Sequence, residues 1–268
     1  MSVLMSEIVN NLGKYNPAFR VKRDSYVRCC KFLNNNDLPL DSKDIYLANI
    51  SNLPPNISSN KIVNLLFFTN EDVPKYLKDK PMVNYIAVNQ DISKTKIFNE
   101  LQDLFFHHEY KTNCAEKLFN ALNEGRDVQQ ILNICAEILG NPVLLADSFL
   151  YLINYSGFDD SIDEPVWKNY ITTGHIPLEY INQRNLNLTV QNRIAPDIMW
   201  NTSTLKHKQI IGRIRLNNTL IAYLKILEYN KEITKSDIII IPIICNTLAL
   251  AVEKSKYSFL YLNLLLKH

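Results

Sequence analysis

The stretch from Ser93 to Glu124 contains neither glycine nor proline, which sharply limits what this part of the chain can form. Residues suited to one helical stripe recur along it at three- and four-residue spacing: Ile97, Leu101, Leu104, His108, Ala115, Leu118 and Leu122. This period is typical of an α-helix of about seven turns. We therefore predict a linking helix at residues 96–125, between an N-terminal domain at 1–95 and a second domain at 126–268.

Length and composition agree with two domains. A chain of 268 residues exceeds one typical domain, and a hydrophobic fraction of 47% is sufficient for two cores. The apolar stripe of the linking helix has two possible uses. It either forms the seam of a homodimer or packs against its own domain, and the sequence leaves both open.

Three apolar runs dominate the N-terminal part: DIYLANIS, KIVNLLFFTN and MVNYIAVNQ. Continuous rather than alternating hydrophobicity favours strands that are buried on both faces of a sheet. A short helix is expected at Val3 to Leu12, one or two strands between Phe19 and Leu33, and a helix within PKYLKDK. The fold class that follows is α+β, with a small α/β domain at residues 1–95.

Basic residues gather near the N-terminus, interleaved with aromatic rings: Arg20, Lys22, Arg23, Arg28 and Lys31. Such a mixture occurs on nucleic-acid surfaces, where rings stack on bases and cations neutralise phosphates. A solvated strand face explains it better, because Arg20 and Lys22 alternate with period two. The net charge of +2 also provides no strong field toward nucleic acid or membrane.

The second domain begins with a helix and a hairpin. Ile131, Ile134, Cys135 and Ile138 share one helical stripe, and Gly140 followed by Pro142 ends the helix. Two β-rich runs follow, with Asp147 and Ser148 at the bend between them. We expect Asp147 and the turn at Asn141 and Pro142 to fix the fold.

Two later signals complete the domain. Asn217 and Asn218 lie between apolar runs and predict a second hairpin, because asparagine tolerates the left-handed region. Thr234 and Asp237 form a capping-box pattern before a C-terminal helix at residues 236–265. The run IIIIPII argues for a strand, but the capping pattern is the more specific signal.

The segment after the first hairpin is expected to form a lid of two short helices. Its acidic residues, Asp159, Asp160, Asp163 and Glu164, lack the spacing of a calcium loop. Asp163 and Glu164 before Pro165 are better explained as caps of a helix start. The candidate ligand-binding residues are Tyr151, Trp167, Tyr170, His175 and Trp200, since large amphipathic rings often line small-molecule pockets. The alternative is that these rings only pack the lid against a sheet.

Several chemistries find no support in the sequence. The five cysteines have no metal-ligand spacing, and phosphate-binding glycine loops are absent. His107 and His108 point about 100 degrees apart on a helix and are expected at the surface. We predict no cofactor, no metal and no catalytic residue, although His175 leaves a hydrolase as a remote alternative. Without a signal peptide or a long uncharged apolar run, the predicted location is the cytoplasm and not a membrane.

The second domain resembles the GAF-like sensor region of PucR-type (purine catabolism regulator) transcription factors of low-GC bacteria. The resemblance covers about residues 127–258 and is carried by Glu137, Leu139, Asn141, Pro142, Asp147, Trp167, Gly174, Gly212, Ile214 and Asp237. It implies a central antiparallel sheet flanked by helices. It also implies DNA binding only through a helix-turn-helix region, which these residues do not include.

The function expected from this resemblance is regulatory. A small-molecule effector of unknown identity would bind in the GAF-like domain of a homodimer, and helices would transmit the signal. The alternative is a dimerisation or protein-interaction module that binds no ligand.

Overall fold

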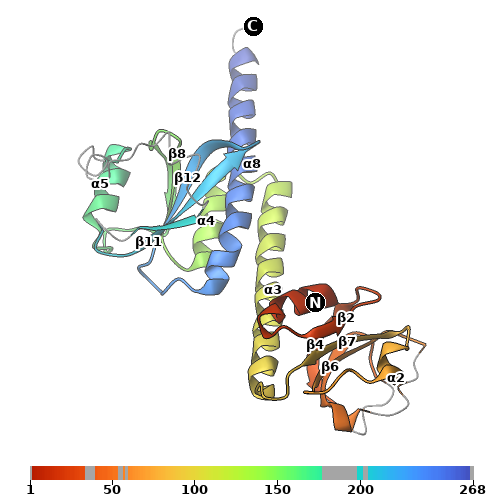
Figure 1. The fold of residues 1–268 in the computed structure, drawn as a ribbon. Helices are drawn as coiled ribbons and strands as arrows, with labels where there is room; N and C mark the ends of the chain where they lie inside the picture. Colours follow the sequence, from red (N-terminus) through yellow and green to blue (C-terminus); the bar gives the residue numbers. More distant parts are fainter. Residues whose placement is uncertain are drawn as a thin grey trace. The chain divides into compact units, whose positions relative to one another are not determined.

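The computed structural model describes residues 2–33, 40–53, 57, 60–176, 198–201 and 205–265, with side chains described up to Ser255. It confirms the α+β class and divides into two compact units, Met1–Tyr110 and Lys111–His268. The division falls inside the helix α3 (Lys94–Asn123), which occupies the position predicted for the linking helix. Figure 1 shows the elements, and each unit is described by itself below.

A five-stranded sheet forms the centre of the N-terminal unit, in the order β2-β7-β6-β5-β4. Its strands are β2 (Ala18–Arg20), β4 (Cys29–Phe32), β5 (Asp44–Asn49), β6 (Val63–Phe68) and β7 (Val83–Val88). β4, β5, β6 and β7 are parallel, and β2 is added antiparallel to β7. The three apolar runs are thus the three central strands.

Both faces of this sheet are buried, as the runs predicted. One face, with Ile45, Leu66 and Ile86, shares a core with α1 (Met5–Asn11) and the start of α3. The other, with Tyr46, Phe67 and Tyr85, packs against a layer that includes α2 (Lys75–Lys78). Short 3-10 turns occur at η1 (Gly13–Tyr15) and η2 (Ile50–Asn52).

Buried amides fasten a loop to the amino ends of these strands. Asn84 Nδ2 donates to Asn64 Oδ1 at 2.9 Å, and Asn84 Oδ1 accepts from the Lys22 amide at 3.0 Å. Ser25 Oγ donates to Asn64 Oδ1 at 2.7 Å. Since buried polar groups need partners, this network determines where residues 22–25 cross the sheet edge.

The solvated-face interpretation of the basic residues does not hold for Arg20, whereas Arg28 and Lys31 are exposed. The half-buried Arg20 donates to the carbonyls of Leu77, Lys80 and Val83, at 2.7, 2.6 and 3.2 Å. Arg28 and Lys31 form ion pairs with Asp44, whose side chain is fully buried. Period-two alternation does not continue past Arg20, because β2 ends there and β3 (Tyr26–Val27) instead pairs with β1 (Val3–Leu4).

The predicted stripe of α3 is largely buried against the chain itself. Ile97 and Leu101 are fully buried in the N-terminal core, and Leu118 is fully buried in the C-terminal unit. Phe106 and Phe119, outside the predicted stripe, are each 62% exposed. Of the two uses weighed for the stripe, packing against its own domain accounts for Ile97, Leu101 and Leu118.

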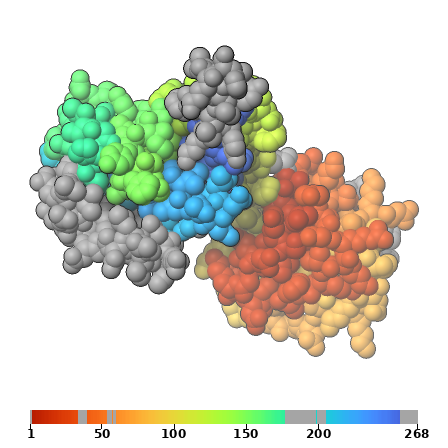
Figure 2. Space-filling view, turned by 90° about the horizontal axis from the view of Figure 1, so that it is seen from above, coloured from red at the N-terminus to blue at the C-terminus, as the bar shows by residue number. Residues whose placement is uncertain are grey.

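The C-terminal unit contains an antiparallel sheet in the order β10-β11-β12-β8-β9. Its strands are β8 (Val143–Asp147), β9 (Leu152–Ser156), β10 (Ile198–Asn201), β11 (Gln209–Leu216) and β12 (Thr219–Leu227). α5 (Pro165–Thr173) lies on one side of it, and α4 (Val128–Leu139) and α8 (Lys235–Leu265) lie on the other (Figure 1). In Figure 2 the green β8–β9 hairpin and the blue β11–β12 hairpin lie side by side, as the pairing of β8 with β12 requires.

The predicted turns are confirmed. Gly140 ends α4 at a φ of 63°, and Asn217 and Asn218 have φ values of 48° and 64° between β11 and β12. Asp147 Oδ1 accepts the amides of Phe149 and Tyr151, which closes the first hairpin. These left-handed positions carry residues that tolerate them, apart from Leu150 at 69°.

Asn141, directly after α4, is hydrogen-bonded to the segment that follows β12. Its buried Oδ1 accepts the amides of Tyr229, Asn230 and Lys231, and its Nδ2 donates to the Lys231 carbonyl. One side chain next to α4 therefore shapes the connection between β12 and α8. This confirms the structural role predicted for the turn.

The prediction of a C-terminal helix is also confirmed. Thr234 and Asp237 form the reciprocal capping bonds, and α8 continues through Pro242. Buried Ile240, Ile241 and Ile244 hold this helix against the sheet despite the proline. At Gly212 in β11, an added Cβ would lie 2.8 Å from Cys245 Sγ, so this glycine permits the close approach.

Among the described residues, one helical span, Lys235–Ser255, is long and apolar enough to cross a membrane by length and composition. Within the protein, 56% of the most apolar window of this helix is buried. The core helix of a soluble protein passes the same test, so this feature alone is weak evidence for a membrane span.

Candidate functional site

The two faces of the C-terminal sheet differ in chemistry. The helix face, toward α4 and α8, carries apolar side chains and Gly212 on the central strands. The lid face is defined here as the opposite face, toward α5, with Leu144, Ala146, Gln209, Arg213, Lys225 and Leu227. Strand alternation places these six side chains on one side.

Trp167 and Tyr170, two of the predicted ligand-binding residues, fill part of the lid face themselves. Each is 1% exposed and belongs to a core with Leu144 and Leu227. Trp167 Nε1 donates to Gln209 Oε1 at 3.2 Å, and the Tyr170 hydroxyl donates to the Leu150 carbonyl at 2.6 Å. Burial, and secondarily the charge of Asp147, raise the pKa of Tyr170, so its hydroxyl stays protonated as a donor.

The other predicted residues are placed differently. Tyr151 is 58% exposed, and its backbone forms an isolated antiparallel bridge with that of the exposed His175. Trp200 pairs with Ile210 through the backbone, while its side chain lies outside the described residues. The predicted second lid helix falls in residues 177–197, which are not described either. The structure thus brings together Trp167 with Tyr170, and Tyr151 with His175.

Three polar side chains of the lid face are buried, one at the start of β11 and two within β11 and β12. Gln209, Arg213 and Lys225 are 5%, 4% and 5% exposed. Lys225 Nζ lies 4.3 Å from the centroid of the Tyr170 ring, a cation–π contact. Because Lys225 pairs with Ile211, two residues from Arg213, the two cations are diagonal neighbours on adjacent strands. Sequence reasoning missed this set, although Gln209 and Arg213 are four residues apart in QIIGRIRL, a spacing that places both on one face of a strand.

The helix start predicted at Pro165 is confirmed, because α5 begins there, but the side-chain caps expected from Asp163 and Glu164 are not formed. Glu164 occupies the N-cap position, but its side chain makes no capping bond and is instead buried. Its Oε2 accepts the His207 amide at 3.2 Å and lies 3.4 Å from His207 Nδ1. Asp163 also does not cap, since it pairs with Lys206 at 2.6 Å. Both acids attach the start of α5 to the segment before β11.

A pocket of about 330 Å³ lies in the N-terminal unit, lined by the residues that follow β6 and β7 together with the start of β2. We name it the strand-end pocket. Its lining residues are Asn16, Ala18, Phe19, Thr69, Asn70, Glu71, Asp72, Val73, Lys78, Tyr85, Ala87 and Asn89. Sequence reasoning did not identify it, because the parallel strand order that gathers these segments is not evident from the runs themselves.

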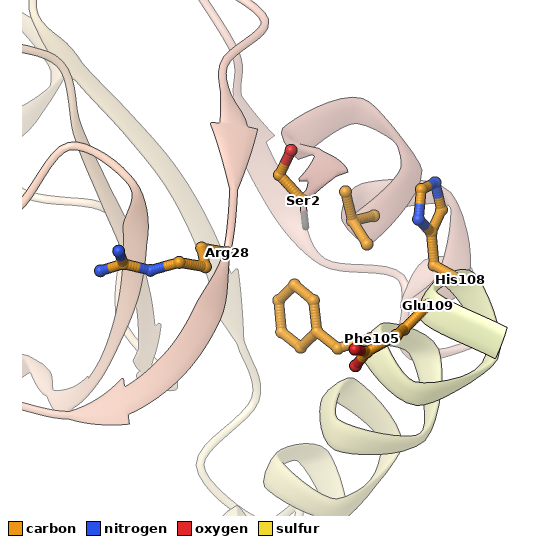
Figure 3. Close-up of a pocket in the computed structure, with 6 residues that line it drawn as sticks. Ser2, Arg28, Phe105, His108 and Glu109 are labelled. Atoms are coloured by element: carbon orange, nitrogen blue, oxygen red, sulfur yellow. The ribbon is translucent and has the colours of Figure 1, made fainter. Parts of the chain in front are cut away.

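A second, smaller pocket of about 170 Å³ is lined by Ser2, Val3, Arg28, Phe105, His108 and Glu109. Figure 3 shows the side chain of Arg28 extended away from the ring of Phe105. This direction agrees with the pairing of Arg28 with Asp41 and Asp44. The guanidinium therefore pairs with Asp41 and Asp44 beside the sheet and is directed away from Phe105.

Three of the cysteines have thiols with a raised pKa. Burial raises the pKa of the Cys30 and Cys135 thiols, which keeps them protonated and unreactive. Burial and a hydrogen bond to Asp44 raise the pKa of Cys29 as well. Within the described residues, no group of three His, Cys, Asp or Glu side chains is placed to hold a metal ion.

Comparison with known proteins adds no family: no family model matches the chain, and no curated protein matches it.

Proposed function

We propose that the chain is a non-enzymatic sensory module, the ligand-binding part of a PucR-like bacterial transcriptional regulator in the cytoplasm. The observation that carries the proposal is the chemical difference between the two faces of the C-terminal sheet. The helix face is an apolar packing surface, while the lid face buries Gln209, Arg213 and Lys225 among aromatic rings.

Burying polar groups costs free energy, so a sheet that needs only a core is expected to use apolar residues there. A few polar groups in an apolar, aromatic setting are typical of small-molecule sites. An arginine and a lysine on neighbouring strands suit an effector with hydrogen-bond acceptors. The sheet with helices on both sides is also the architecture implied by the GAF-like resemblance.

Transmission would use the helix face. α8 follows β12 through the turn shaped by Asn141, and α4 leads into β8 through Gly140 and Asn141. An effector that moves β12 relative to β8 changes the packing of both helices, and in a homodimer this change reaches the partner. DNA contact belongs to a helix-turn-helix region that these residues do not include.

A thermal-shift screen of the full chain with purines, nucleotides and amino acids tests the proposal. Tryptophan fluorescence provides a local readout, because both tryptophans, Trp167 and Trp200, lie in the C-terminal unit. An effector on the lid face should raise the melting temperature and alter this emission. Lys225→Met should abolish both effects, while Lys208→Met, which changes an exposed lysine directly before the neighbouring strand β11, should retain them. Lack of stabilisation by every compound would contradict the ligand proposal.

A ligand-free interaction module is the second candidate, favoured by the packing of Trp167 and Tyr170. Both rings are fully buried with their polar atoms bonded, so they need no ligand to complete them. This candidate predicts a dimer by light scattering at micromolar concentration without any stabilising compound. A monomer at that concentration would count against it and against dimeric signalling as well.

A further inference from the structure

The strand-end pocket lies where parallel sheets commonly bind ligands. Thr69 to Val73 follow the carboxyl end of β6, and Asn89 follows that of β7. In open sheets with parallel strands, ligands bind beyond these carboxyl ends, where loops meet. The pocket also borders the point at which β2 joins the sheet in the opposite direction.

Internal hydrogen bonds hold the walls of the pocket in place. Thr69 Oγ1 accepts the Glu71 amide at 2.9 Å, and Asn70 Oδ1 accepts the Gln90 amide at 3.1 Å. Asn89 Oδ1 accepts the Asp91 amide at 2.7 Å. Because a backbone N–H can only donate, these bonds fix both asparagine amides with their NH₂ groups left to donate elsewhere.

The floor is fixed as well. Arg20 bonds to three carbonyls around the end of α2 and lies over the Tyr85 ring, 5.2 Å from its centroid. β2, α2 and β7 are thereby tied together beside the pocket. A preformed site loses less entropy on binding than one that must first be ordered.

The floor provides an apolar surface with space above it. Ala18 and Ala87 are partners in the β2–β7 register. Their methyl groups leave space in the pocket that larger side chains at these positions would occupy. Val73 and Tyr85 are buried beside them, while Phe19 is 55% exposed. A small apolar group on a ligand can lie against these side chains.

Charges of both signs line the same pocket. Glu71 and Asp72 supply carboxylates, and Lys78 supplies an ammonium group. All three residues are exposed, and none forms an ion pair within the described part of the chain. A ligand that carries one ammonium and one carboxylate satisfies both signs, with the asparagine NH₂ groups as further donors to its carboxylate.

We propose that the strand-end pocket binds a free α-amino acid with an apolar side chain. The ammonium group pairs with Glu71 and Asp72, the carboxylate with Lys78, and the side chain lies on the floor at Ala18 and Ala87. A volume of about 330 Å³ suits a ligand of this size. This site is separate from the lid face and does not depend on the function proposed for it.

Isothermal titration of the full chain with L-leucine tests the inference. Two analogues of leucine test the two charged groups separately: 3-methylbutylamine lacks the carboxylate, and 4-methylpentanoic acid lacks the ammonium. L-leucine is expected to bind with a Kd of about 0.1–1 mM, since an open site supports few strong contacts. Each analogue is expected to bind at least about tenfold more weakly.

Matched variants locate the site. Lys78→Met and the double change Glu71→Gln with Asp72→Asn should each weaken L-leucine binding about tenfold. Lys75→Met and Asp79→Asn, which alter exposed charges of α2 outside the pocket, should leave it unchanged. Ala18→Leu, at an exposed position of an edge strand, should block the floor while circular dichroism shows an intact fold.

Three outcomes overturn the inference: no binding of L-leucine, L-isoleucine, L-valine or L-phenylalanine at about 10 mM, equal binding of L-leucine and either analogue, or binding that is insensitive to the pocket variants. Lys225→Met on the lid face separates the two proposals. If the strand-end pocket is the site, this variant retains L-leucine binding whether or not the lid face has an effector.

Discussion

The two sheets of this protein are each covered on both faces, yet they bury polar side chains in different places. In the N-terminal unit, Asn64 and Asn84 lie near the amino ends of strands and bond to a neighbouring loop. In the C-terminal unit, Gln209 begins β11, while Arg213 and Lys225 lie within β11 and β12 on a face that also carries rings. The buried asparagines of the N-terminal sheet thus attach a loop to the strand ends. The buried polar residues of the C-terminal sheet instead make the lid face polar.

The units also depend on different connections. A shared network of several side chains fixes the loop of the N-terminal unit, whereas one amide, Asn141, accepts three backbone amides in the C-terminal unit. Damage to a single residue should therefore be more costly in the C-terminal unit. The four predictions below test this contrast, beginning with the largest expected effect.

Asn141→Ala should destabilise the C-terminal unit by about 3 kcal/mol, because buried backbone amides lose their acceptor. Urea unfolding followed by tryptophan fluorescence measures this, since both tryptophans lie in that unit. Asn133→Ala, at an exposed site on α4, is the control with little expected change. An Asn141→Ala midpoint equal to that of the control would show that the turn holds without the side chain.

Gly212→Ala should destabilise the same unit by about 2 kcal/mol through overpacking. The new Cβ would lie 2.8 Å from Cys245 Sγ and 3.1 Å from Ile241 Cγ2, both on α8. Gly13→Ala in the N-terminal unit is the matched control, as nothing lies within 4 Å of its added Cβ. Equal thermal midpoints for the two variants would disprove a tight contact between β11 and α8.

Acid should weaken the N-terminal unit through Asp44. Burial opposes ionisation of this carboxyl, but hydrogen bonds from Lys31 and Cys29 and the charge of Lys31 outweigh it and lower its pKa. A lowered pKa stabilises the folded state above the ordinary value of 3.8, and this stabilisation is lost as the pH falls through the folded pKa. Asp44→Asn should flatten the stability profile below pH 3.8, measured by far-ultraviolet circular dichroism. An unchanged profile would exclude Asp44 as a source of acid sensitivity.

Asn218→Ala should cost about 1 kcal/mol, and Asn218→Gly should be close to neutral. The residue has a φ of 64°, where an alanine Cβ is strained and glycine is not. Thermal unfolding of the pair measures the difference. If both substitutions gave the same midpoint, the turn between β11 and β12 would have changed its backbone geometry.

Local signals in the sequence predicted much of this fold. The helix end at Gly140, the turn at Asn217 and Asn218, and the helix start at Thr234 and Asp237 were all located correctly. Each of these signals depends only on residues that are close together in the sequence. The apolar runs likewise predicted central strands that are buried on both faces. Short-range stereochemistry is sufficient for features of this kind.

Partnerships between distant segments could not be predicted in the same way. Glu164 before Pro165 has the local pattern of a cap, yet its carboxylate accepts from His207, which is distant in the sequence. Trp167 and Tyr170 were expected to line a ligand pocket or to pack the lid against a sheet, and only the fold shows that their polar atoms bond to Gln209 and Leu150. The strand-end pocket depends on strand order, which hydrophobic runs do not determine.

The boundary between the two units inside α3 has a mechanical consequence. A flexible loop lets two bodies rotate independently, whereas a helix resists torsion because each amide is bonded to the carbonyl four residues earlier. Ile97, buried in the N-terminal core, and Leu118, buried in the C-terminal unit, both belong to this one helix. Four glycines inserted between Tyr110 and Lys111 would remove this torsional stiffness while leaving both cores intact. Ligand binding by each unit could then be measured separately from any signal that passes through the helix.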